Sequence, residues 1–103
     1  MVMSTGVNQG DILQVESVSR PVLVVSTNYF HGSGAAMVCP IFPRGDEGVL
    51  HRRIRTSELQ GVVHCEQVKM LDLRSRGYKK VGRIGLNEQI DISDILQGLF
   101  DYM

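Results

Sequence analysis

The sequence lacks any hydrophobic run long enough to span a membrane, and it lacks a basic segment followed by an apolar stretch of the secretory type. We therefore expect neither a membrane protein nor a secreted one, and we expect the chain to stay in the cytoplasm. Internal repeats and low-complexity tracts are also absent. With 103 residues, 43% of them hydrophobic, the chain is expected to form one domain over residues 1–103, of which residues 1–9 are a loose polar leader.

Cysteine is scarce, and its two positions do not have the spacing of a metal-binding pair. Cys39 and Cys65 both stand among apolar or strand-forming residues, so we expect reduced structural thiols in preference to a disulfide or a nucleophile. Neither a cofactor nor a metal site is expected.

The net charge is zero, but the charges are unevenly distributed. Residues 44–83 carry ten basic residues against five acidic ones, and residues 84–103 carry four acidic residues and no basic one. This division suggests a cationic surface that attracts a polyanion, with the acidic segment turned elsewhere. The alternative is a solvated face whose charges pair within the fold or within a dimer.

Short apolar segments separated by Gly, Pro and Asn predict a chain made mostly of strands. The continuous apolar run 21–25 is the expected centre of the core, and Pro40 is expected to make the end of the third strand an edge or a bulge. The basic segment 49–55 is expected to be an exposed edge strand. The predicted strands are 11–18, 21–25, 35–42, 49–55, 62–65, 67–73 (strand or tight turn) and 78–86, with a turn over 27–34 and a loop over 43–48.

The last part of the chain has a different periodicity. Its apolar residues fall at the spacing of one helix face, and Asn87 or Asp91 is a candidate cap. The stripe consists of Ile92, Ile95, Leu96, Leu99 and Phe100. Several strands followed by one helix predict a mainly β (α+β) fold, a compact antiparallel SH3-like barrel with a C-terminal amphipathic helix.

The densest polar chemistry lies in residues 61–77, GVVHCEQVKMLDLRSRG. In an extended strand, side chains two residues apart share a face, so His64 and Glu66 are expected to point one way and Cys65 the other.

These residues resemble the second signature block of the MazF/PemK toxins, bacterial ribonucleases of toxin–antitoxin pairs. The first block of that family also has a counterpart, and the resemblance runs from about Gly10 onward. Its matching residues are Gly10-Asp11-Ile12, Arg20-Pro21, the strand 22–26, Asn28 and Pro40-Ile41.

The resemblance implies a homodimer that cleaves single-stranded RNA with sequence selectivity and without a metal ion, using the 2′-hydroxyl as nucleophile. It also implies a cognate antitoxin whose acidic, disordered tail folds across the basic face and competes with RNA.

Three residues are candidates for catalysis. Arg20 matches the arginine of the family's Arg-Pro pair, to which catalysis is attributed, and its guanidinium suits bidentate phosphate contact. His64 is a natural acid or base at neutral pH, and Glu66 could orient it. The alternatives are a strand-flanking arginine that keeps an edge soluble and a surface His–Glu pair.

Further polar and basic residues are candidates for RNA binding, with turn closure or a solvated face as their alternative roles. Tyr29, Phe30 and Tyr78 could stack bases or pack in the core, whereas His31 and His51 are given no role. The RNA-binding candidates are Ser26, Thr27, Gln67, Lys69, Arg74, Arg76, Lys79 and Lys80.

The chain departs from the family pattern at three places. Only residues 17–19 join the first strand to Arg20, so the family's longer loop with its Gly-x-Glu-Gln motif is missing. Phe42 replaces a threonine credited with catalysis, and His64 replaces an arginine or a small residue. A catalytically silent relative, or a gyrase-poison type that binds protein, is therefore the alternative function, although the Trp-Gly-Ile tail of gyrase poisons is missing. A plain SH3-like adaptor is a third reading, for which no dedicated aromatic groove is evident.

Overall fold

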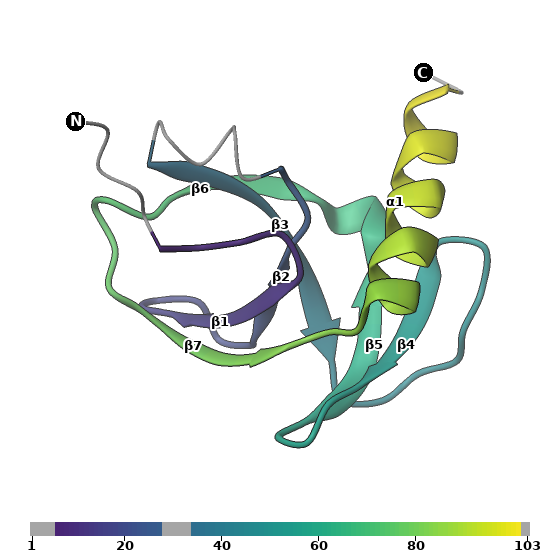
Figure 1. Ribbon diagram of the computed structural model, residues 1–103, viewed down its shortest axis with the longest axis horizontal. Helices are drawn as coiled ribbons and strands as arrows, with labels where there is room; N and C mark the ends of the chain where they lie inside the picture. Colours follow the sequence, from purple (N-terminus) through teal and green to yellow (C-terminus); the bar gives the residue numbers. More distant parts are fainter. Residues whose placement is uncertain (1–5, 28–33, 102–103) are drawn as a thin grey trace.

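The computed structural model describes residues 6–27 and 34–101, which form a strongly curved antiparallel sheet with one helix beside it (Figure 1). The strand order is β4-β5-β3-β2-β1-β7, and β6 adds to β3. The sheet is a half-barrel, because β4 and β7 stand at its two ends, and the predicted antiparallel barrel with a C-terminal helix is confirmed. The elements are β1 (Asp11–Val15), β2 (Val22–Val24), β3 (Ala35–Phe42), β4 (His51–Arg55), β5 (Gln60–His64), β6 (Lys69–Asp72), β7 (Tyr78–Arg83) and α1 (Leu86–Asp101).

Several predicted boundaries were wrong. Strand β1 ends at Val15 because the chain turns at Ser17, whose φ of 67° is left-handed. The segment after β5 forms a 3₁₀ turn, Cys65–Gln67, before β6 begins. Strand β5 itself begins at Gln60, and β7 gives way to the helix after Arg83.

Pro40 does not make an edge or a bulge, which corrects the prediction. It is buried inside β3, in the middle of the sheet and opposite Val22. The N–H of Ile41 donates to Pro21 on the β2 side, so a donor at Pro40 would point to the other side of β3. On that side, β3 pairs with β5 and with β6, and the 3₁₀ turn between these two strands lies opposite Pro40. The turn is not extended, so the missing N–H of Pro40 removes no hydrogen bond between strands.

The sheet is buried on both faces, as the apolar run in β2 predicted. Leu23 belongs to a core cluster that includes Ile92 and Leu96 of α1, whereas Val22 and Val24 belong to a second cluster. This second cluster also contains Val7, which is 3% exposed. The described part of the predicted loose leader, residues 6–9, is therefore anchored to the sheet.

Helix α1 confirms the predicted apolar stripe but not its caps. Ile92 and Leu96 are buried, whereas Phe100 is half exposed. Because the helix begins at Leu86, Asn87 and Asp91 lie inside it; instead, Glu88 Oε1 accepts a hydrogen bond from the Gly85 N–H (3.0 Å). Within residues 6–27 and 34–101, no helix has the length and apolarity needed to cross a membrane.

Gly61 provides a test of how closely β5 approaches β3. A Cβ at this position would lie 2.5 Å from the Phe42 carbonyl oxygen and 2.8 Å from Ile41 Cγ2. Gly61→Ala is therefore expected to destabilise the fold by about 1–3 kcal/mol, measured by denaturant unfolding. Gly98→Ala is the matched control: nothing lies within 4 Å of its Cβ position, so the same change in α1 should stabilise by up to about 1 kcal/mol. Equal unfolding midpoints for the two variants would contradict the close approach.

Candidate functional site

Four side chains contact one another in sequence across the sheet: one from the residues before β2 and one each from β3, β5 and β4. The Arg20 Cζ atom lies 4.1 Å from the centroid of the Phe42 ring. The centroids of Phe42 and His64 are 4.0 Å apart, and those of His64 and His51 are 3.9 Å apart with ring planes 18° from parallel. We call Arg20, Phe42, His64 and His51 the stacked row.

The stacked row follows from the strand register. His51 and His64 are direct cross-strand partners in β4 and β5. Phe42 pairs with Val62, two residues before His64, so Phe42 and His64 are diagonal neighbours on one face. Arg20 stands two residues before Val22, which pairs with Pro40, and this places Arg20 beside Phe42.

Glu66 joins the stacked row by a different route from the one predicted. The extended conformation ends at His64, and the 3₁₀ turn carries Glu66 back toward both histidines. Its Oε2 lies 2.7 Å from His51 Nε2, and its Oε1 lies 3.7 Å from His64 Nδ1. His64 and Glu66 therefore lie together and Cys65 faces the core, as predicted, but a 3₁₀ turn and not an extended strand produces this arrangement.

His51 is the functional candidate that sequence reasoning missed. It contacts both His64 and Glu66, yet it lies 15 residues from Glu66 in the sequence. The available signal was the β4–β5 hairpin, because its register alone pairs His51 with His64. Gln67, which was predicted, also reaches this point: its Nε2 lies 3.5 Å from His64 Nδ1.

The surroundings of His64 favour its neutral form. Its side chain is 18% exposed. Burial lowers the pKa of the imidazole below its ordinary value, His51 and the Arg20 guanidinium lower it further, and the Glu66 carboxylate opposes them. A neutral imidazole can accept a proton, which is the requirement for a general base.

Arg20 also borders a hollow of about 410 Å³ next to the stacked row. Pro21, Pro43 and Leu59 supply apolar walls, and Gln60 adds a polar amide. A guanidinium at the edge of a partly apolar hollow can hold an anionic group while a flat apolar ring occupies the space beside it.

Ser26 and Thr27 lie apart from Arg20, at the other end of β2. The Ser26 Oγ accepts a hydrogen bond from the Met37 N–H (3.0 Å), a contact that favours the turn-closing role. Asn28, Tyr29, Phe30 and His31 lie outside the described residues. Tyr78 packs against the second core cluster.

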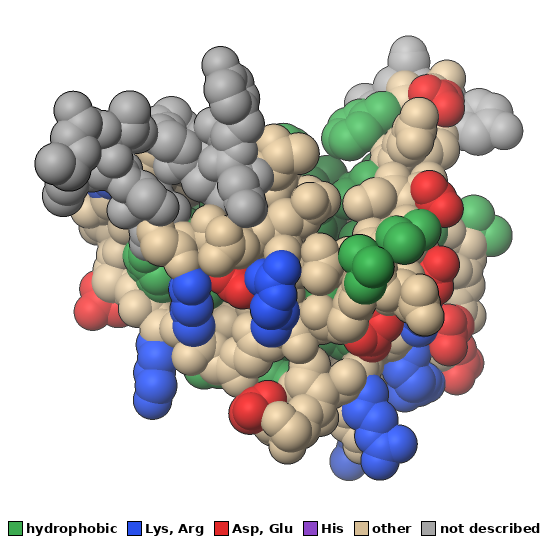
Figure 2. Space-filling view, in the orientation of Figure 1, with side chains coloured by type: hydrophobic (Ala, Val, Ile, Leu, Met, Phe, Trp, Pro, Cys, Tyr) green, Lys and Arg blue, Asp and Glu red, His purple; other side chains and the backbone are tan. Residues whose placement is uncertain are grey.

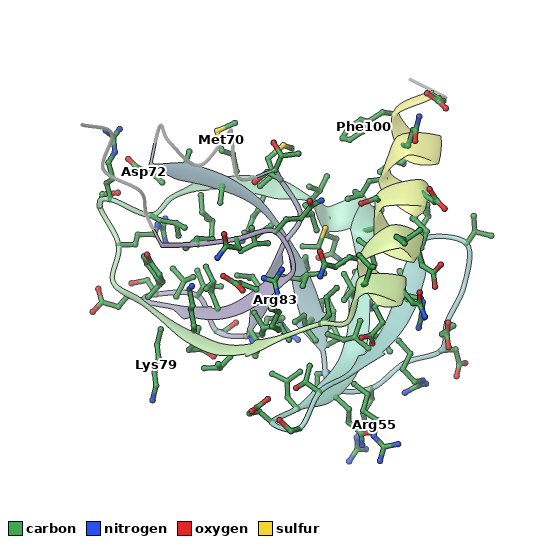
Figure 3. The ribbon with its side chains drawn as sticks, in the orientation of Figure 1. Arg55, Met70, Asp72, Lys79, Arg83 and Phe100 are labelled. Carbon is green, nitrogen blue, oxygen red and sulfur yellow. The ribbon has the colours of Figure 1, made fainter. Side chains whose placement is uncertain are left out.

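The other basic candidates do not converge on Arg20. Lys80 pairs with Asp11 at 3.2 Å, and the Nε of Arg74 lies 3.8 Å from Asp72. Figure 3 shows Lys79 on β7 and Arg55 at the end of β4, well separated from each other. Exposed basic residues without a salt bridge in the described part of the chain include Lys69, Arg76 and Lys79.

The acidic segment is not turned away from the basic one, which corrects that expectation. Arg52 forms an ion pair with Asp91 of α1 at 3.0 Å, and Glu88 accepts the Arg55 N–H at 2.9 Å. Figure 2 shows acidic side chains along α1 beside basic ones near the start of the helix. Part of the charge division is therefore used to attach α1 to β4.

The two cysteines lie in the core behind the stacked row and are free thiols. Hydrogen bonding to Cys65 and burial raise the pKa of Cys39 above its ordinary value. A buried neutral thiol of this kind packs and does not act as a nucleophile.

Comparison with known proteins places this geometry in a family. The model of the "PemK-like, MazF-like toxin of type II toxin-antitoxin system" matches residues 8–100. The endoribonuclease toxin ChpB of Escherichia coli K12 is 30% identical over 97 residues, covering 80% of this chain and 84% of ChpB. The chain therefore resembles this toxin along most of both sequences.

Solved structures share the fold. The MazE–MazF crystal structure (Form-I) from Deinococcus radiodurans superposes with a TM-score of 0.83 at 21% identity, covering 92% of this chain and 96% of that chain. An endoribonuclease in complex with its cognate antitoxin, from a mycobacterial species, gives a TM-score of 0.80 at 15% identity, with coverages of 95% and 98%. On the family match and the ChpB identity, this chain belongs to the PemK-like, MazF-like toxins of type II toxin–antitoxin systems.

Proposed function

We propose that this protein is a toxin endoribonuclease that cleaves single-stranded RNA at selected sequences, without a metal ion, by attack of the 2′-hydroxyl on the adjacent phosphate. The observation that carries the proposal is that Arg20 and His64 both stack on Phe42. A permanent cation and a titratable imidazole thereby contact the same ring, and Arg20 also borders a hollow that suits an unpaired base.

In this mechanism the Arg20 guanidinium binds the phosphate oxygens and stabilises the charge that develops on the phosphorane. Neutral His64 accepts the 2′-hydroxyl proton, and the nearby Glu66 carboxylate stabilises the resulting imidazolium. The 5′-oxygen leaves after it takes a proton from solvent, and the other fragment ends in a 2′,3′-cyclic phosphate. Phe42 moves no proton; its ring positions Arg20 and His64.

Exposed cations elsewhere on the surface would supply sequence-independent phosphate contacts. Lys69, Arg76 and Lys79 are available for such contacts, because they form no salt bridge within the described residues. We assign Lys80 and Arg74 a lesser share, since each is partly neutralised by an aspartate. We assign Gln67 a contact with RNA beside His64, because its Nε2 lies 3.5 Å from His64 Nδ1.

We also propose that the protein forms a homodimer and is neutralised by a cognate antitoxin. Membership of a type II toxin–antitoxin family supports an antitoxin partner, and so do the solved complexes of similar fold with MazE or a cognate antitoxin. An acidic, disordered antitoxin tail would compete with RNA for Arg20 and the exposed cations.

One observation favours a second candidate function, a catalytically silent or protein-binding relative. Phe42 occupies the space next to Arg20, where the Arg20 Cζ atom lies 4.1 Å from the centroid of its ring. A phenyl ring can neither donate nor accept a proton, so this position supplies no acid or base for cleavage.

The test of the proposal is incubation of purified protein with a long unstructured RNA in the presence of chelator. We expect discrete fragments whose ends carry 2′,3′-cyclic phosphate, identified by mass spectrometry. Intact RNA, with protein that circular dichroism and light scattering show to be folded and dimeric, would contradict nuclease activity and favour the silent or protein-binding relative.

A further inference from the structure

We propose that His51, His64 and Glu66 form a binding site for a divalent transition-metal ion of the Zn²⁺ type. One donor atom from each of the three side chains lies within 4.8 Å of the other two. The residues come from three different elements, β4, β5 and the 3₁₀ turn, which the fold brings to one point.

The distances between donor atoms suit such an ion. A tetrahedral Zn²⁺ with bonds of about 2.0–2.1 Å places its donor atoms about 3.3 Å apart. Glu66 Oε2 lies 2.7 Å from His51 Nε2, and the second carboxylate oxygen, Oε1, lies 3.7 Å from His64 Nδ1, so each imidazole nitrogen is near this distance from one oxygen of the carboxylate. The His51 and His64 rings are stacked face to face, and the lone pair of each nitrogen lies in its own ring plane. The imidazoles must therefore rotate out of this stacked arrangement to aim both lone pairs at a shared ion.

The backbone that carries the ligands is held in place without an ion. His51 and His64 are paired in the β4–β5 ladder. The 3₁₀ turn is fixed by two hydrogen bonds, from the Cys65 N–H to Leu50 O (2.9 Å) and from the Val68 N–H to Cys65 O (3.3 Å). Binding therefore orders side chains alone, which keeps its entropic cost low.

The donor set also selects the class of ion. Two imidazole nitrogens and one carboxylate suit Zn²⁺, Co²⁺, Ni²⁺ or Cu²⁺, whereas Mg²⁺ and Ca²⁺ prefer oxygen donors alone. The side chains of His51, His64 and Glu66 are 32%, 18% and 33% exposed, so an ion can enter from solvent and keep water as a further ligand.

Metal binding would have a consequence for RNA cleavage, and this part rests on the proposed function. Coordination engages the His64 imidazole and the Glu66 carboxylate, which are proposed to accept the 2′-hydroxyl proton and to stabilise the resulting imidazolium. A bound ion would therefore inhibit cleavage.

The test uses the full chain without a histidine tag, freed of metal by chelator. Co²⁺ binding is followed by visible absorption and Zn²⁺ binding by calorimetry. We expect one ion per chain, and an affinity at least about tenfold weaker in each of His51→Gln, His64→Gln and Glu66→Gln. Glu47→Gln is the matched control, because it removes the same charge from an exposed loop residue, and its affinity should equal that of the wild type.

The proposal would be overturned if the protein did not bind one metal ion per chain. It would also be overturned if the variants of His51, His64 and Glu66 bound the ion as tightly as Glu47→Gln does. Cleavage is measured separately, with Zn²⁺ added to the wild type. Intact RNA in every condition, together with normal Co²⁺ spectra, would contradict the proposed nuclease and leave the metal site standing. Binding without inhibition would contradict the link between the two.

Discussion

Replacing Arg20 with alanine is expected to lower the rate of RNA cleavage about 10²–10³-fold, the usual loss when one preorganised donor to the transition state is removed. The fold should be unaffected, because Arg20 precedes β2 and its side chain is half exposed. Single-turnover cleavage of a short unstructured RNA measures the effect. Thermal unfolding and light scattering verify that the variant remains folded and dimeric.

Two further variants serve as controls for Arg20→Ala. Arg20→Lys keeps the charge but loses the planar fork, and we expect an intermediate rate. Arg44→Ala removes an exposed arginine from the loop after β3, outside the candidate site, and should change the rate only about twofold through weaker attraction of RNA. If Arg20→Ala were no slower than Arg44→Ala, Arg20 would be a solubilising strand-flanking residue.

His64→Gln is expected to lower kcat about 10²–10⁴-fold, the range for loss of a general acid or base. The amide keeps much of the size and polarity of the imidazole but cannot accept a proton at neutral pH. Glu66→Gln should have a smaller effect, about tenfold, because the carboxylate acts through His64 and does not touch the substrate. Both effects should appear in kcat and leave KM nearly unchanged.

The opposite pattern would identify a structural role for His64. Its ring stacks between Phe42 and His51, so its removal would then lower the unfolding temperature and leave cleavage near the wild-type rate. A matched variant, His51→Phe, keeps a ring against His64 but removes the nitrogen that contacts Glu66. Comparing the unfolding of the two variants separates stacking from proton transfer.

The sequence predicted those parts of the fold that local patterns determine. The uninterrupted apolar run of β2 indicated burial on both faces, and the spacing of Ile92 and Leu96 indicated a helix that packs with one side. The 3₁₀ turn could not be read in this way, because alternating residues such as His64 and Glu66 also fit an extended strand. The position of the turn depends on where β5 stops pairing with β3 and β6 starts, and this pairing is a property of the tertiary structure.

Only part of the candidate site could be predicted, because its arrangement also depends on tertiary structure. Arg20 and His64 were identified from residue type and family resemblance, but their contact through Phe42 depends on the register of separate strands. Phe42 was recognised as a loss of catalytic chemistry and not as the platform between them. Charge counts had a similar limit: Arg52 and Asp91 are 39 residues apart, and no local pattern indicates that they pair.

The helix that covers the sheet has a consequence for biosynthesis. Every residue of the stacked row, and Glu66, has been synthesised well before α1 is complete. Ile12 and Leu23, however, belong to a core cluster that is complete only once Ile92 and Leu96 of the helix have joined it. A nascent chain that stops short of Ile92 leaves this face of the sheet open to water and to chaperones. Ribosome-bound fragments of the toxin should therefore be inert toward RNA, and toxicity should begin only after the helix has emerged and docked.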